Sequence, residues 1–401
     1  MTQGSASKAF RRRVFYIPGY DPIHPRRYRE LYRKEGAAQA AISGYPLALQ
    51  PKTAKGSYGW HVTGPAGTHA DIEVLVWSDI VRTSMQQGIF ATYLQLIRTA
   101  AAYIGTGALF RLMQLRKGPM IAALYPIGML MLQAAIALLA AYGTYKLGAL
   151  VHPVPALVAA LAVAFLILRA FRDQDNQLYA YYLMHDYAFT AQNLGANPAA
   201  LETRMATFRA TIAQALTDEI DEVLVVGHSS GAHLAVSILA DLIRAGLPAR
   251  RPALAFLSLG QVVPMISFLP KANRLRADLQ FLSARDEITW VDVTAPGDGC
   301  AFALCDPVSV TGVAPPDKRW PLVISAAFTQ TLSPAKWKHL RWRFFRLHFQ
   351  YLCAFDALSG GPGDYDYFQI TAGPVTLQKR YENRAPSKSR IETPRSGYRS
   401  I

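Results

Sequence analysis

The chain has 401 residues, and its 42 Lys and Arg outnumber its 27 Asp and Glu, which gives a formal net charge of +15. Apolar residues make up 51% of the chain and charged residues only 17%, whereas soluble domains contain about 25% charged residues. A disordered chain is excluded because it would need low hydrophobicity. Three cysteines are too few for a disulfide scaffold.

The N-terminal part of the chain contains strand and helix signals separated by turns. Arg13–Ile17 is a β-branched and aromatic run that ends at Pro18-Gly19, so we predict a strand followed by a sharp loop. Later patterning predicts a helix over Pro25–Ile42, strands over Tyr58–Thr63 and Ala70–Trp77, and a helix over Ser84–Phe110. The end of that last helix is uncharged, and we expect it to lie against a membrane.

The apolar excess is concentrated in two uncharged runs of 28 and 22 residues on either side of Lys146. As a helix the first run would be about 42 Å long, and the hydrocarbon core of a bilayer is about 30 Å thick. We therefore predict a two-helix transmembrane hairpin over residues 118–172, in which Pro153 and Pro155 start a short second helix over Ala156–Phe171. The alternative is a buried helical hairpin of a large soluble protein.

Cations flank the outer ends of this hairpin, and a single lysine lies between its two runs. They are Arg111, Arg116 and Lys117 before the first run, and Arg169 and Arg172 after the second. The positive-inside rule then places both termini, and the chain outside the hairpin, in the cytoplasm. The expected partner is the lipid bilayer, because anionic phospholipid accounts for the positive charge better than nucleic acid does.

After the hairpin, strands alternate with helices, which predicts an α/β fold with a mostly parallel sheet flanked by helices. The predicted elements are a helix over Leu201–Leu216, a strand over Asp221–Val226, a helix over Ala232–Ala245, a strand over Ala253–Leu259, a helix over Ala272–Ala284, a strand over Ile288–Thr294 and a last strand over Trp342–Leu347. Strands before and after the hairpin can share one sheet only if the chain crosses the membrane an even number of times.

These signals divide the chain into four parts. Residues 1–117 form the N-terminal part of a globular domain, residues 118–172 the membrane hairpin, and residues 173–378 the C-terminal part of that domain. Residues 379–401 carry seven Lys and Arg and two Glu among Pro, Ser and Gly. We expect this last part to be a disordered basic tail near anionic lipid.

One motif carries a chemical signal. Gly227-His228-Ser229-Ser230-Gly231 has the pattern G-x-S-x-G, and it directly follows one predicted strand and directly precedes a predicted helix. Strand–turn–helix is the context in which this pattern forms a nucleophile elbow. A tight turn with small flanking residues would project the Ser229 hydroxyl at the helix N-terminus, where amides and the helix dipole favour negative charge.

With this motif the sequence resembles the α/β-hydrolase superfamily of serine hydrolases, which includes lipases and esterases. The resemblance covers roughly residues 14–77 and 221–356, in element order more than in residue detail. It implies that Ser229 is a nucleophile and that an acid and a histidine follow it in that order. His348 follows the last predicted strand and is the expected base, with His339 as the alternative. His233, one helical turn past Ser229, is expected to be a packing or pocket residue.

The acid in such a triad stands after a late strand. Asp298 lies just past the strand predicted over Ile288–Thr294, at the edge of the sheet where ligand-facing loops gather. We predict that Asp298 orients the histidine, and Asp306 and Asp292 remain alternatives. Asp beside Gly and Pro is also common in turns that have no catalytic role.

An oxyanion hole should combine the Ser230 amide with an amide from the loop after the first strand. Gly19 would allow a close approach there, and Tyr20 supplies an N–H that the neighbouring prolines lack. The sequence predicts neither a cofactor nor a metal site, since it contains no nucleotide-binding or zinc-ligand pattern. Cys300 and Cys305 are interpreted as ordinary thiols.

Taken together, these patterns predict a membrane-anchored serine hydrolase that cleaves carboxylic ester or thioester bonds. The membrane location suggests lipids or other acyl esters as substrates. Two alternatives stay open at this point. An acyltransferase could use the same site with an alcohol in place of water, and a non-catalytic membrane scaffold could retain a hydrolase-like fold.

Overall fold

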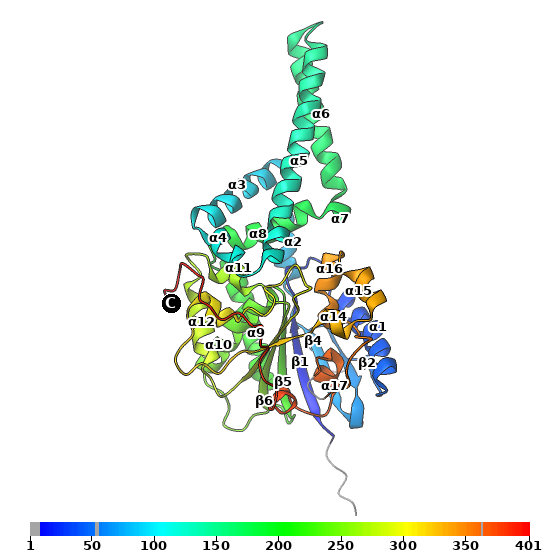
Figure 1. Ribbon diagram of the computed structural model, residues 1–401, viewed down its shortest axis with the longest axis vertical. Coiled ribbons are helices and arrows are strands. Elements are labelled where there is room, and N and C mark those ends of the chain that lie inside the picture. The colour runs from blue at the N-terminus through cyan, green and yellow to red at the C-terminus, as the bar shows by residue number, and fades with distance from the viewer. Residues whose placement is uncertain (1–8, 53–55, 362–363) are drawn as a thin grey trace, which may run out of the picture.

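The computed structural model describes residues 9–52, 56–361 and 364–401. Within them, eight strands form one sheet (Figure 1). From one edge to the other the strands are β2 (Ala48–Pro51), β3 (Gly59–Thr63), β4 (His69–Val74), β1 (Arg11–Ile17), β5 (Glu222–His228), β6 (Ala253–Leu259), β7 (Thr289–Thr294) and β8 (Leu322–Ser325). Strands β4 to β8 of this order run parallel, and β2 and β3 are antiparallel to their neighbours. The predicted α/β class with a mostly parallel sheet is confirmed.

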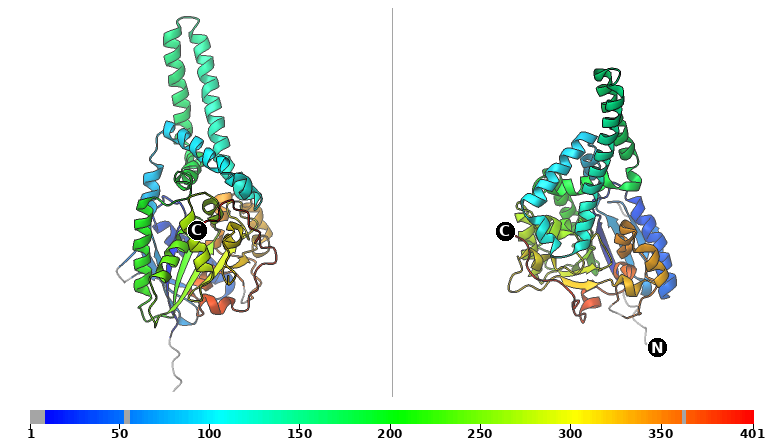
Figure 2. Two further views of the ribbon diagram at one scale, coloured as in Figure 1. Left: turned by 90° about the vertical axis from the view of Figure 1, so that its left-hand side faces the viewer. Right: turned by 45° about the horizontal axis from the view of Figure 1, so that its top comes forward.

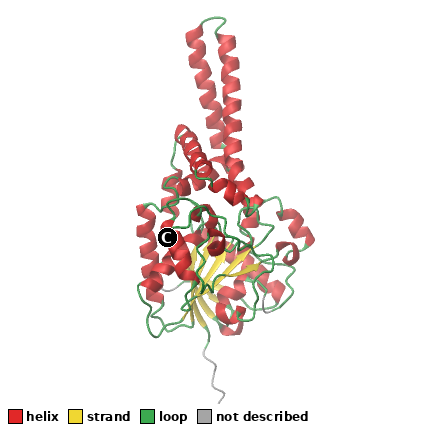
Figure 3. Cartoon of the chain, turned by 60° about the vertical axis from the view of Figure 1, so that its left-hand side comes forward, coloured by secondary structure: helices red, strands yellow, loops and turns green. Residues whose placement is uncertain are grey.

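Helices cover both faces of the sheet, so the globular body has three layers (Figure 3). The hydrophobic core on one face includes side chains of α2 (Ser78–Met85), α9 (Ala199–Ala215), α10 (Gly231–Arg244), α11 (Val263–Ser267), α12 (Asn273–Ser283) and α13 (Pro307–Thr311). The core on the other face includes side chains of α1 (Arg26–Ser43), α14 (Phe328–Thr331), α15 (Pro334–Leu340), α16 (Phe344–His348), η2 (Gln350–Leu352), α17 (Tyr367–Ala372) and α18 (Leu377–Tyr381). A short 3-10 turn, η1 (Pro65–Gly67), joins β3 to β4.

Strand β1 shows why these segments form the centre of the sheet. Val14 and Tyr16 belong to one core, and Phe15 and Ile17 belong to the other. All four side chains are buried, because neighbouring residues of a strand point to opposite faces and both faces here are covered.

Two long apolar helices, α5 (Lys117–Gly148) and α6 (Pro153–Asp173), form a hairpin that projects far beyond the globular body (Figures 1 and 2). Both are long and apolar enough to cross a membrane. Only 22% of the most apolar window of α5 is buried, and only 11% of that of α6. The hairpin is therefore not the buried core hairpin that the sequence left open as an alternative.

Three further helices lie between the hairpin and the body, namely α3 (Ile89–Gly105), α4 (Ala108–Met113) and α8 (Ala180–Ala191), and the short α7 (Asp175–Leu178) links α6 to α8. The single helix predicted over Ser84–Phe110 is wrong, since α2, α3 and α4 share that segment. Gly88 precedes α3, and Gly107 precedes α4 with a left-handed φ of 72°. Glycine adopts this conformation easily, so the chain turns there.

The last predicted strand is also wrong. Residues of Trp342–Leu347 form most of helix α16. The final strand of the sheet is β8, which pairs with β7 at the edge. The two basic residues of this segment, Arg343 and Arg346, are three positions apart, and this spacing places them on one face of a helix rather than on alternate positions of a strand. Strand β8 has only 4 residues and gave no clear pattern of its own.

Residues 379–401 also differ from the disordered tail that we expected, because they lie along the globular body. Ile391 forms a parallel bridge with Cys305, and the Arg395 amide donates to the Val310 carbonyl at 2.9 Å. The fully buried guanidinium of Arg276 donates to the Ser400 carbonyl at 2.7 Å. These backbone contacts tie the basic segment to the face covered by α12 and α13.

Candidate active site

Ser229 occupies the turn between β5 and α10, with a left-handed φ of 57°. This conformation is uncommon for a residue with a side chain and costs about 1–3 kcal/mol. The residues two positions before and two positions after Ser229 must be glycine. An added Cβ at Gly227 would lie 2.7 Å from Ala232 Cα, and one at Gly231 would lie 2.2 Å from the Ile17 carbonyl oxygen. The spacing of the motif therefore produces the tight strand–turn–helix geometry of a nucleophile elbow, and Ser229 is partly accessible at its tip.

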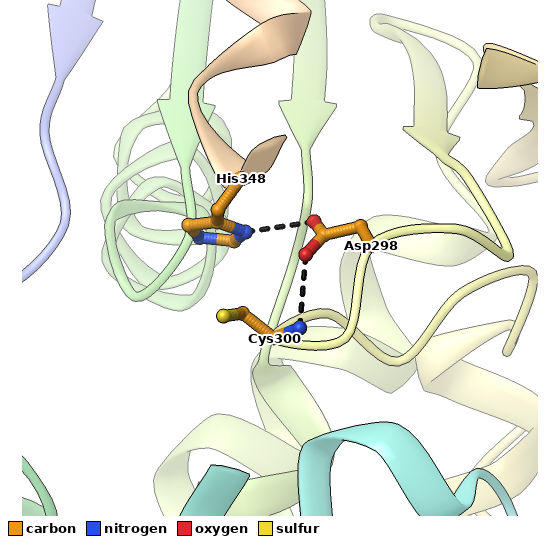
Figure 4. A group of neighbouring side chains, drawn as sticks. All are labelled: Asp298, Cys300 and His348. Atoms are coloured by element: carbon orange, nitrogen blue, oxygen red, sulfur yellow. Dashed lines mark hydrogen bonds and ion pairs between the residues drawn. The ribbon is translucent and has the colours of Figure 1, made fainter. Parts of the chain in front are cut away.

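His348 and Asp298 come together at the same end of the sheet. His348 ends helix α16, Asp298 lies in the loop after β7, and the distance from His348 Nδ1 to Asp298 Oδ2 is 2.7 Å. Figure 4 shows the Asp298 carboxylate between the His348 ring and the backbone of Cys300, whose amide donates to Asp298 Oδ1 at 2.9 Å. Since a carboxylate only accepts, Nδ1 carries the proton and Nε2 is left as the basic nitrogen.

Burial alone would raise the pKa of Asp298, but the charge of His348 and the hydrogen bonds to the carboxylate outweigh it, so the net pKa is lowered. One of those bonds comes from a residue that the sequence analysis did not single out. The Tyr351 hydroxyl donates to Asp298 Oδ2 at 3.0 Å and accepts a hydrogen bond from the Ala295 amide, also at 3.0 Å. The position of Tyr351 three residues after His348 is the only signal that could have indicated it.

The His348 ring lies beside the serine turn. His228, the residue before Ser229, donates from Nε2 to the His348 carbonyl oxygen at 3.0 Å, and the two ring centroids are 4.9 Å apart. Burial lowers the pKa of His228 to about 3, so this imidazole is neutral. The Ser229 amide donates to the Leu259 carbonyl oxygen at 2.9 Å. Gly260, which follows Leu259, packs against the His348 ring, since an added Cβ there would lie 3.0 Å from His348 Cε1.

The hydroxyl of Ser229 makes no hydrogen bond to any residue in the described ranges. Ser229, His348 and Asp298 thus lie at the same end of the sheet. The hydrogen bond between His348 and Asp298 is formed, whereas that between Ser229 and His348 is not. In enzymes without bound substrate the bond between nucleophile and base is often long and tightens when substrate binds.

Two of the predicted oxyanion residues, Gly19 and Tyr20, lie in the loop after β1, next to the serine turn that contains Ser230. An added Cβ at Gly19 would lie 2.9 Å from Ser229 Cβ, so only glycine allows the loop to approach this closely. The Tyr20 amide donates to the Ser230 hydroxyl at 2.8 Å and is therefore already engaged. No acceptor for the Ser230 amide occurs among the described residues, so this N–H is free to meet a developing negative charge beside Ser229.

None of the alternative triad members takes part in the His348–Asp298 pair, whereas His233, the expected pocket residue, lies beside the serine turn. His339 is exposed on α15. Asp306 caps α13 and pairs with Lys318 at 2.6 Å, while Asp292 accepts a hydrogen bond from the Ser258 hydroxyl at 2.5 Å inside the sheet. His233 is buried on α10, one turn beyond Ser229, and its Nδ1 has no partner in the described part of the chain.

Cys300 is closer to this site than its assignment as an ordinary thiol suggested. Potential ligand atoms of Asp298, Cys300 and His348 lie within 4.8 Å of one another, which is the spacing of a metal site. In this structure the His348 nitrogen facing Asp298 is engaged by that carboxylate, and burial raises the pKa of the Cys300 thiol well above its ordinary value. A metal would require the thiolate.

The site lies at the root of the hairpin. Gly118 at the start of α5 packs on Gly299, the residue after Asp298: an added Cβ at Gly118 would lie 3.1 Å from Gly299 Cα. Arg116 Nε donates to the Ala303 carbonyl at 2.7 Å, and the Tyr182 hydroxyl on α8 donates to the Tyr20 carbonyl at 2.5 Å. The loops that carry the site therefore contact the segments that lead into and out of the hairpin.

We compared the chain with protein-family models, with curated proteins and with solved structures, and none of the three comparisons gave a match.

Proposed function

We propose that the protein is a membrane-anchored serine hydrolase that cleaves carboxylic ester or thioester bonds. The observation that carries this proposal is the hydrogen-bonded His348–Asp298 pair beside a serine held at positive φ between a strand and a helix. A serine hydroxyl is a weak nucleophile unless a base accepts its proton and a third group orients that base. Ser229, His348 and Asp298 have the side chains for these three roles, His348 is bonded to Asp298, and the ring of His348 packs against that of His228, the residue before Ser229.

In the proposed reaction the Ser229 oxygen attacks the acyl carbonyl carbon, and its proton passes to His348 Nε2. Asp298 accepts the hydrogen bond from Nδ1 and stabilises the resulting imidazolium. The Ser230 amide donates to the oxyanion, and His348 returns its proton to the leaving alcohol or thiol. Water, deprotonated by His348, then attacks the acyl-serine and releases the acid and the free serine.

The membrane part of the proposal rests on where apolar side chains are exposed. The α5–α6 hairpin leaves most of its apolar surface uncovered. Near its base, Phe90, Ile97 and Phe110 on α3 and α4 are more than half exposed, and Trp342 is 72% exposed beside α16. Large apolar side chains on the surface mark contact with a membrane or a partner. A bilayer around the hairpin would cover these side chains together.

A fluorophosphonate probe tests the proposal, because it reacts with serines activated by a neighbouring base. We expect the full-length protein in detergent to be labelled and the Ser229→Ala variant to lose labelling. Ser237→Ala is the matched control, since Ser237 is buried on α10, the helix that follows the serine turn, and should not affect labelling. No labelling of folded wild-type protein, or equal labelling of Ser229→Ala, would refute the nucleophile assignment.

A further inference from the structure

A second group of polar side chains lines an opening next to the serine turn. The opening lies between α8, α10, the loop after β1 and the segment from Gly195 to Leu201. Its walls include Tyr20, Trp77, Asp186, Phe189, Ser230 and His233. Two of these residues, Asp186 and His233, have no part in the reaction proposed above. Both are ionisable, and both carry atoms without a partner.

Asp186 comes from α8, which crosses between the hairpin and the body (Figure 1). The side chain is half-buried and makes no hydrogen bond or ion pair with any residue in the described ranges. Burial raises its pKa to about 7, although the nearby charge of His348 acts in the opposite direction. A half-buried carboxyl group without a protein partner is stabilised by a ligand that offers it a hydrogen bond.

His233 faces the same opening from α10. It is only 8% exposed, and its Nδ1 has no partner in the described part of the chain. Burial lowers its pKa to about 4, so the imidazole is neutral and has one donor and one acceptor nitrogen. An unpartnered buried polar atom is rare in folded proteins and calls for an explanation.

The aromatic walls indicate which ligand fits. Trp77 and Tyr20 are almost fully buried and pack edge to face, with ring centroids 6.2 Å apart. Their faces are thus covered, whereas an aromatic cage for a quaternary ammonium group must present open ring faces. A hydroxyl group suits the remaining polar atoms better, because it can donate to the Asp186 carboxylate while it accepts from the imidazole N–H of His233, and a second hydroxyl can donate to the other imidazole nitrogen.

We infer that this opening is a binding subsite for free hydroxyl groups on the alcohol part of the substrate, with Asp186 and His233 as its specificity-determining residues. The substrate class is then an acyl ester of a polyol, such as a monoacylglycerol. The inference rests on the proposed function for the ester, since Ser230 belongs to both the opening and the serine turn. The hydroxyl-binding property itself does not depend on catalysis.

Kinetics with a matched pair of esters tests the specificity. Glyceryl monobutyrate and ethyl butyrate share the acyl group, and only the first has free hydroxyls. We expect Asp186→Ala in the full-length protein to lower the ratio of kcat/KM for the glyceryl ester to that for the ethyl ester by about ten- to hundredfold, the effect of one or two lost hydrogen bonds. Asp186→Asn should restore part of the ratio, because an amide still pairs with hydroxyls.

Asp286→Ala is the control, since Asp286 is an exposed carboxylate away from the opening. Thermal unfolding of each variant shows that it is folded. An unchanged ratio in folded Asp186→Ala would overturn the subsite, as would an equal loss on both esters.

A binding measurement separates this inference from the proposed function. Calorimetry of the Ser229→Ala protein should show at least tenfold tighter binding of 1-O-hexylglycerol than of ethyl hexyl ether, and Asp186→Ala in the same background should remove the difference. Hydroxyl-dependent binding by the Ser229→Ala protein, together with no ester hydrolysis by the wild-type protein, would refute the proposed function alone. Equal binding of the two ethers, or stronger binding of a choline ether, would overturn the hydroxyl subsite.

Discussion

Asp298 accepts three hydrogen bonds, from the His348 ring, the Tyr351 hydroxyl and the Cys300 amide. A carboxylate held in this way cannot rotate, so the plane and the tautomer of the imidazole are fixed before substrate arrives. Tyr351 also accepts from the Ala295 amide, which ties the end of β7 to the segment after α16. In the proposed hydrolase Tyr351 is therefore a positioning residue.

Tyr351→Phe should separate positioning from stability. Losing one hydroxyl should cost about 1 kcal/mol of unfolding free energy, since a typical hydrogen bond contributes about that much. We also expect kcat/KM to fall about tenfold, because Asp298 loses one of the bonds that hold it. Tyr365→Phe is the control: its hydroxyl donates to the Tyr351 carbonyl at 2.6 Å and does not reach Asp298. Similar loss of activity in both variants would contradict the positioning role.

The sequence predicted those strands, helices and turns whose geometry is determined by a short run of consecutive residues. The serine turn is specified by five consecutive residues, so its geometry was predictable, and so were the buried strands β1, β5 and β6. Contacts between segments that are distant in the sequence were harder to predict. The His348–Asp298 pair was expected only from the order of strands and helices along the chain. The roles of Tyr351, Cys300 and Asp186 could not be predicted, because each depends on how α8, α16 and a loop meet in space.

The contact between the hairpin and the Asp298 loop gives a second prediction. Gly118→Val would place side-chain atoms against the backbone of Gly299, so the start of α5 or the loop must shift. We expect slower labelling of Ser229 by a fluorophosphonate, because the shift disturbs Asp298 and hence His348.

Gly128→Val is the matched control for this experiment. Gly128 lies on the same helix with open space around it. It should change the labelling rate little, although both variants exchange a glycine for valine on the same helix. Equal rates for the two variants would show that the packing at Gly118 has no influence on the site.

At the scale of the whole molecule, the hairpin and the cations around its base predict one orientation in a membrane. Val151, in the turn between α5 and α6, is 91% exposed and should lie outside the cell, whereas Ser389 on the globular body should lie in the cytoplasm. In intact cells a membrane-impermeant maleimide should modify Val151→Cys and leave Ser389→Cys unmodified until the cells are permeabilised. The reverse pattern would contradict the cytoplasmic site.

The pairing of β1 with β5 joins residues that are far apart in the chain. Arg12 and Glu222 form a buried ion pair across these strands although they are 210 positions apart in the sequence. The whole hairpin lies in the segment between these two residues. Chains are synthesised from the N-terminus, so the hairpin leaves the ribosome before β5 and the serine turn exist. In the proposed membrane hydrolase the hairpin can therefore enter the bilayer before the sheet closes, and the proposed active site is assembled only after that step.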